Sequence, residues 1–99
     1  MTDFIPIAEP IIGREEAQAV FDQVLSGWIT MGKRVMALEE RISAIAGAKH
    51  AIAMANGTAT LHAALACMGV GPGDDVIVPT LSYVSSANAV LYCGANVVF

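Results

Sequence analysis

The stretch Asn56–Ala59 is the part of the sequence best suited to hold a small anion. It follows a short apolar run and precedes a helical pattern, so Ala51–Gly73 predicts a strand, a tight turn and a helix N-terminus. Such an N-terminus has unpaired N–H groups and a positive dipole end, which bind an anion without Lys or Arg. Gly57 permits close backbone approach, Thr58 can cap the helix and offer its hydroxyl, and Ala59 adds an unhindered N–H. A plain strand-to-helix turn with a capping threonine fits the same spacing.

Two aromatic residues in predicted loops could contact a ligand. Tyr83 lies just past the carboxyl end of a predicted strand, where open α/β sheets bind ligands, and its ring could stack on a flat group. Trp28 stands in the loop Trp28–Gly32, which also contains Thr30. Local packing is the alternative for Tyr83, and a packing anchor is the alternative for Trp28.

Three other patterns carry no chemistry of their own. Gly69–Gly73 looks like a dinucleotide fingerprint, but it follows a helix and precedes a strand, which reverses the order the fingerprint needs. Cys67 and Cys93 lack CxxC spacing and are expected to be reduced and buried. The two histidines are not spaced with them as metal ligands, so no metal site is predicted.

Composition limits the class of protein. The chain has 99 residues and a net charge of -4 without a Lys/Arg cluster, which argues against a nucleic-acid surface. Apolar residues make up 56% and charged residues 14%, which suits the interior of a larger α/β protein. The uncharged stretch 76–99 is interrupted by polar residues, glycine and proline, so no membrane span is expected. No basic leader follows Met1, and a cytoplasmic protein is predicted.

The expected elements alternate in type after two helices. An extended arm over Ile5–Ile12 precedes helices at 14–25 and 33–46, a strand at 51–55, a helix at 58–68, a strand at 75–78, a helix at 82–93 and a strand at 96–99. Apolar residues recur at helical spacing on one face of each of the first three helices. The alternation predicts an α/β fold with a mainly parallel sheet. Because the last strand is followed by no turn, we expect the N-terminal piece of a larger protein.

Two segments in this order resemble the N-terminal part of the DegT/DnrJ/EryC1/StrS family of pyridoxal-phosphate-dependent sugar aminotransferases. They are SGWITMGKRVMALEERISAIAGAKHAIAMANGTATLHAAL and GVGPGDDVIVPTLSYVSSANAVLYCGANVVF. The resemblance implies a fold-type I aminotransferase, with residues 1–99 forming the N-terminal segment of its cofactor-binding large domain. The family's phosphate-binding turn falls on Gly57, Thr58 and Ala59, and its ring-stacking aromatic falls on Tyr83. Trp28 and Thr30 match a loop near the substrate.

The resemblance also implies a reaction and its participants. Pyridoxal 5'-phosphate would be the cofactor, glutamate the amino donor, a nucleotide-linked keto-sugar the acceptor and a homodimer the working form. The Schiff-base lysine is expected beyond Phe99, because neither Lys33 nor Lys49 occupies its motif position. No catalytic residue is therefore assigned within the chain. A sugar dehydratase of the same fold and a truncated, non-catalytic product remain as alternatives.

Overall fold

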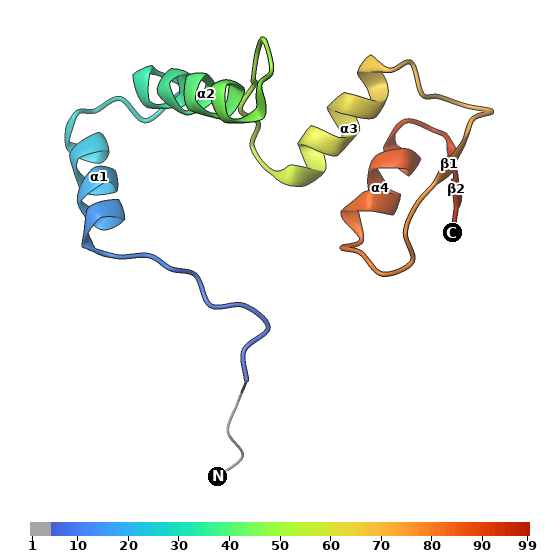
Figure 1. The fold of residues 1–99 in the computed structure, drawn as a ribbon, viewed down its shortest axis with the longest axis horizontal. Coiled ribbons are helices and arrows are strands. Elements are labelled where there is room, and N and C mark those ends of the chain that lie inside the picture. Colours follow the sequence, from blue (N-terminus) through green and yellow to red (C-terminus); the bar gives the residue numbers. More distant parts are fainter. Residues whose placement is uncertain (1–4) are drawn as a thin grey trace.

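Two helices follow an extended arm in the computed structural model, which describes residues 5–99 (Figure 1). Helix α1 spans Arg14–Leu25 and helix α2 spans Lys33–Ala46, both with the predicted bounds. The side chain of Glu16 accepts the N–H of Gly13 at 2.7 Å and so satisfies a donor at the start of α1. Helix α2 ends at Gly47, whose φ of 63° is the left-handed conformation that glycine adopts at little cost.

The second half of the chain alternates helices and strands. Helix α3 spans Gly57–Cys67, strand β1 Asp75–Ile77, helix α4 Ser85–Tyr92 and strand β2 Asn96–Val98. The two strands pair in parallel, with Asp75 opposite Asn96 and Ile77 opposite Val98. Helix α4 is the connection between them and packs on β2 as well as on α3. The predicted α/β architecture with a parallel sheet is confirmed.

Two predicted elements differ from the structure by more than one residue at an end. Residues Ala51–Ala55 form no strand, because no other segment of residues 5–99 lies alongside them to complete a ladder. Helix α4 begins at Ser85 rather than Ser82, since residues 80–84 turn before it. The hydroxyl groups of Ser82 and Ser86, 2.8 Å apart, join this turn to the first turn of the helix.

A small apolar core lies between the sheet and helices α3 and α4. Val78, Val90 and Ala95 form its buried centre, and Val90 is 1% exposed. Partly buried side chains complete it, namely Leu65, Val70, Val76 and Val97. These residues come from both strands, both helices and the turns between them, so this core fixes the mutual arrangement of the second half of the chain.

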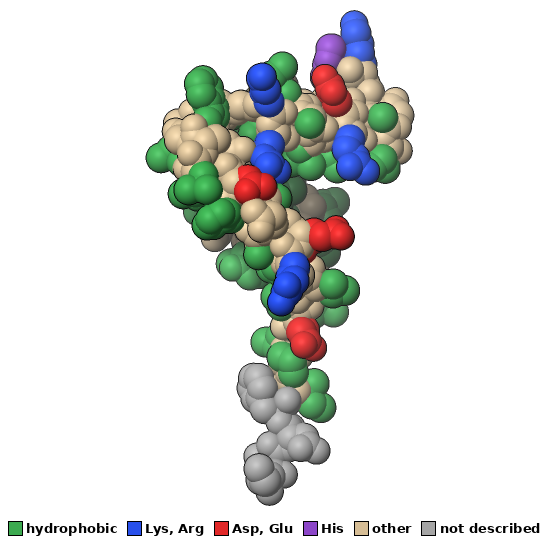
Figure 2. Space-filling view, turned by 90° about the vertical axis from the view of Figure 1, so that its left-hand side faces the viewer, with side chains coloured by type: hydrophobic (Ala, Val, Ile, Leu, Met, Phe, Trp, Pro, Cys, Tyr) green, Lys and Arg blue, Asp and Glu red, His purple; other side chains and the backbone are tan. Residues whose placement is uncertain are grey.

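The apolar faces predicted for the first two helices are exposed. Phe21 in α1 is 57% exposed and Ile45 in α2 is 80% exposed. Hydrophobic side chains therefore appear at the surface between charged ones (Figure 2). The radius of gyration is 18.1 Å, against about 13 Å for a compact chain of this length. The helices thus lack a covering layer among residues 5–99, and the prediction that Cys67 is buried is wrong for the same reason.

Candidate functional site

A helix begins at the predicted turn, but a different residue caps it. Asn56 is extended, its side-chain Oδ1 accepts the N–H of Ala59 at 2.9 Å, and its carbonyl accepts the N–H of Thr60 at 3.2 Å. The prediction that Thr58 caps the helix is therefore wrong, because α3 begins one residue earlier. The N–H of Ala59 is also engaged rather than unhindered.

Two backbone donors remain at this helix end. Among residues 5–99, the N–H groups of Gly57 and Thr58 have no hydrogen-bond partner. No acidic residue stands in the first turn, and a Cβ added at Gly57 would meet no atom within 4 Å. The turn thus presents two unpaired N–H groups at the positive end of a helix dipole, beside a glycine whose Cβ position is open. That arrangement suits a small anion such as a phosphate.

Tyr83 stands in the loop that enters α4 and is 78% exposed. Its carbonyl accepts the N–H of Ser86 at 3.0 Å, which holds the backbone of the loop against the helix. Helices α3 and α4 pack together, and both begin at the lower end of the pair in Figure 1. The turn that opens α3 and the loop that leads into α4 therefore lie at the same end of this pair, and the exposed phenol ring of Tyr83 in that loop can stack on a flat group.

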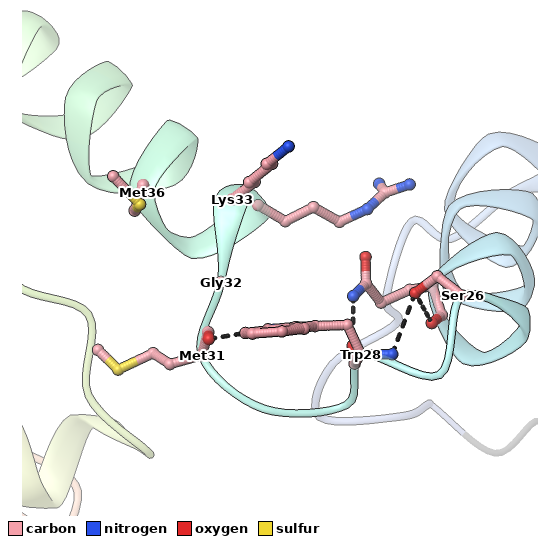
Figure 3. A pocket seen from close by; sticks show the side chains of 8 residues that line it. Ser26, Trp28, Met31, Gly32, Lys33 and Met36 are labelled. Carbon is pink, nitrogen blue, oxygen red and sulfur yellow. Dashed lines mark hydrogen bonds between the residues drawn. The ribbon is translucent and has the colours of Figure 1, made fainter.

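Trp28 is held within the loop that joins α1 to α2. Its indole Nε1 donates to the carbonyl of Met31 at 2.9 Å, and its backbone N–H donates to the hydroxyl of Ser26 at 3.2 Å (Figure 3). The side-chain amide of Gln23 donates to the carbonyl of Trp28. The ring therefore has a fixed orientation although it is 59% exposed.

Trp28 lines two hollows of this loop. The larger has a volume of about 540 Å³, and Met31, Gly32, Lys33 and Met36 also line it, as Figure 3 shows. The smaller, of about 140 Å³, is lined by both Trp28 and Thr30. The structure thus brings together the two residues predicted to face a substrate. Neither of these two hollows is lined by Gly57 or Tyr83.

Sequence reasoning missed two residues that form hydrogen bonds at the turn at Gly57 or just before it. Asn56 stood inside the predicted motif, and its position before a helix was the available signal for a cap. Glu39, in α2, accepts the N–H of Ala53 at 2.8 Å, and no local sequence signal links residues 14 positions apart.

Comparisons with known proteins match this chain to a family model and to similar sequences. The model of the DegT/DnrJ/EryC1/StrS aminotransferase family matches residues 10–99. The spore coat polysaccharide biosynthesis protein SpsC of Bacillus subtilis (strain 168) is 44% identical over 96 residues, which are 97% of this chain and 25% of that protein. The UDP-4-amino-4-deoxy-L-arabinose--oxoglutarate aminotransferase of Shewanella sediminis (strain HAW-EB3) is 41% identical over 98% of this chain and 25% of its own length.

Solved structures give the same result. The PLP-form of Spr1654 from Streptococcus pneumoniae superposes with a TM-score of 0.86 at 37% sequence identity. That match covers 95% of this chain and 24% of Spr1654. The chain therefore spans about a quarter of the length of the relatives that it matches.

Proposed function

Because the chain belongs to the DegT/DnrJ/EryC1/StrS aminotransferase family, we propose that it supplies part of the cofactor site of a pyridoxal-phosphate-dependent sugar aminotransferase. The observation that carries this proposal is the pair of unpartnered N–H groups on Gly57 and Thr58 at the start of α3. In this proposal residues 1–99 form the N-terminal segment of the cofactor-binding domain, of which 1–4 lie outside the described residues. The lysine that would bind the cofactor covalently is not assigned within the chain.

The residues at this end of α3 and α4 fit the proposed cofactor. Its phosphate is a small anion, for which the two N–H groups at the helix start are suitable donors, and Thr58 also carries a hydroxyl group. Its pyridine ring is flat and apolar on both faces, which suits the exposed ring of Tyr83. The family resemblance assigns Ala59 to the same turn. Because its N–H already donates to Asn56 Oδ1, Ala59 would help to hold the turn in shape rather than donate to the phosphate. When bound, pyridoxal phosphate acts as the electron sink for amino-group transfer.

We propose a nucleotide-linked keto-sugar as acceptor and an amino acid, glutamate, as donor. The relative from Shewanella sediminis is named for a UDP-linked amino sugar and oxoglutarate, and oxoglutarate becomes glutamate when it receives an amino group. The relative from Bacillus subtilis is named for polysaccharide biosynthesis. Trp28 and Thr30 would face the sugar substrate from the loop before α2, in an enzyme that works as a homodimer.

The proposal is tested by removing one donor without disturbing the helix. Proline is well tolerated at the first helical position, and the extended Asn56 before it is compatible with proline. Gly57→Pro therefore deletes one N–H and keeps α3. Gly57→Ala is the matched control, because it keeps the N–H and its Cβ meets nothing within 4 Å. The protein is expressed from the longest reading frame that contains this chain, and affinities are measured by absorbance titration.

The affinity ratio of pyridoxal phosphate to pyridoxal is the informative quantity, since only the first has a phosphate. Hydrogen bonds to charged groups contribute about 1.5–3 kcal/mol, so Gly57→Pro should lower this ratio by roughly 10- to 150-fold, and Gly57→Ala, which keeps the N–H, should lower it less. An unchanged ratio in Gly57→Pro would show that the phosphate is held elsewhere. A protein that binds the cofactor but lacks the covalent lysine would favour the dehydratase alternative.

A further inference from the structure

We propose that Glu39 is a positioning residue for the turn at Gly57, an inference that rests on the proposed function of that turn. The residue touches neither the proposed phosphate site nor the proposed ring site. It acts on the segment that leads into the turn, through one hydrogen bond from α2.

The contact joins two parts of the chain that otherwise have few links. Glu39 Oε1 accepts the N–H of Ala53 at 2.8 Å, and both residues are half-buried. Among residues 5–99 it is the single hydrogen bond between the first half, up to His50, and everything after it. Helix α2 is therefore connected to the turn by the chain itself and by this carboxylate.

Because Ala53 lies in the segment that leads into the turn at Gly57, its hydrogen bond to Glu39 can affect the turn. Ala53 lies three residues before Asn56, and residues 51–55 have no strand partner within 5–99. A half-buried N–H without an acceptor is costly, and a carboxylate is a strong acceptor for it. The bond fixes the point from which the chain enters the turn, so it limits the directions in which the donors of Gly57 and Thr58 can point.

Geometry of this kind matters for binding a small anion. Donors that are already aligned lose little freedom when the anion arrives, whereas donors on a loose segment must be ordered at that moment. Loss of the Glu39 contact should therefore weaken the binding of a phosphate at the turn. It should leave contacts to a ring at Tyr83 unchanged, because the loop that contains Tyr83 is hydrogen-bonded to the first turn of α4 and not to residues 51–59.

The test compares four variants in the protein expressed from its full reading frame. Glu39→Ala removes the acceptor, whereas Glu39→Gln keeps an oxygen acceptor at the same distance along the side chain and removes the charge. Glu40→Ala is the matched control, because Glu40 is the exposed neighbour on the same helix and its carboxylate makes no hydrogen bond among residues 5–99. Gly57→Pro reports whether the turn holds the phosphate at all.

Two measurements separate positioning from a merely structural role. The first is the affinity for pyridoxal phosphate relative to pyridoxal, and the second is hydrogen exchange at the amides of residues 53–59. Glu39→Ala should lower the affinity ratio about tenfold, equivalent to ~1.4 kcal/mol, and speed exchange at Ala53. Glu39→Gln should restore most of the ratio, and Glu40→Ala should change neither quantity.

The outcomes distinguish this proposal from the one on which it rests. If Gly57→Pro lowers the affinity ratio and Glu39→Ala does not, Glu39 is not a positioning residue and the phosphate site stands. If neither variant lowers the ratio, the phosphate site itself is wrong and both proposals fall. If Glu39→Ala speeds exchange at Ala53 but leaves the affinity ratio unchanged, the hydrogen bond orders only the segment around Ala53, and the inference is overturned.

Discussion

Replacing Gly32 with alanine tests whether the indole of Trp28 fixes the start of α2. Gly32 is the N-cap residue of α2 and its φ of -167° is extended backbone that any residue adopts, so the backbone itself imposes no penalty. A Cβ at Gly32 would lie 2.8 Å from Cδ1 and 3.3 Å from Cε2 of Trp28, and closer still to Nε1. The ring must therefore move to admit the methyl group.

The size of the effect follows from what holds the ring. The Nε1 bond to the carbonyl of Met31 contributes about 0.5–1.5 kcal/mol. Trp28 is 59% exposed, so about two fifths of roughly 150–250 Å² is buried, which contributes ~1.5–2.5 kcal/mol at about 25 cal/mol per Å². Displacing the ring can cost no more than these two contributions together. Overpacking typically costs about 1–3 kcal/mol, and we expect Gly32→Ala to cost about 2 kcal/mol.

The assay is urea unfolding followed by circular dichroism, in two backgrounds. Gly13→Ala is the matched control: Gly13 is the extended N-cap of α1, and its Cβ would come no nearer than 3.4 Å, to Oε2 of Glu16. The control subtracts the general effect of alanine at an N-cap. Gly32→Ala should cost about 1–2 kcal/mol more than Gly13→Ala, and that excess should vanish in a Trp28→Ala background. Equal costs at the two glycines, or an excess that persists without the indole, would refute the reasoning.

Three further predictions concern the core, a turn and a cap. Val90→Ala should lower the free energy of unfolding by about 2 kcal/mol, measured by urea titration, because Val90 is 1% exposed at the centre of the core. Gly94→Ala should cost about 1–3 kcal/mol in the same assay, since φ is 76° and the new Cβ would lie 3.2 Å from Cγ of Pro72. The Gly13 N–H lowers the pKa of the Glu16 carboxyl, and the backbone N–H of Glu16 lowers it further. The resulting stabilisation of α1 is fully present above about pH 4.3, the pKa of an unfolded glutamate, and is lost as the pH falls through the lower pKa of the folded protein. NMR titration of the Glu16 carboxyl should show the lowered pKa. Glu16→Gln should remove this contribution to the pH dependence of stability.

Elements with complete local signals could be predicted from the sequence. Helices α1 and α2 have the predicted bounds, because apolar spacing defines their length and glycines stand at their ends. The strand predicted at Ala51–Ala55 failed, because a strand exists only where another segment supplies its hydrogen bonds. The prediction that the apolar faces of α1 and α2 are buried was wrong for a related reason. An apolar face indicates which side of a helix favours burial, but it does not specify the segment that packs against it.

The candidate site divides in the same way. The sequence by itself determined that a glycine turn opens a helix at residues 56–58 and that an aromatic residue follows the next strand, because turns and helix starts depend on neighbouring residues. Only the tertiary structure decided which donors of the turn remain unpaired, and that α2 reaches Ala53 through Glu39. Those features depend on distances between atoms of separate elements, which spacing along the chain does not specify.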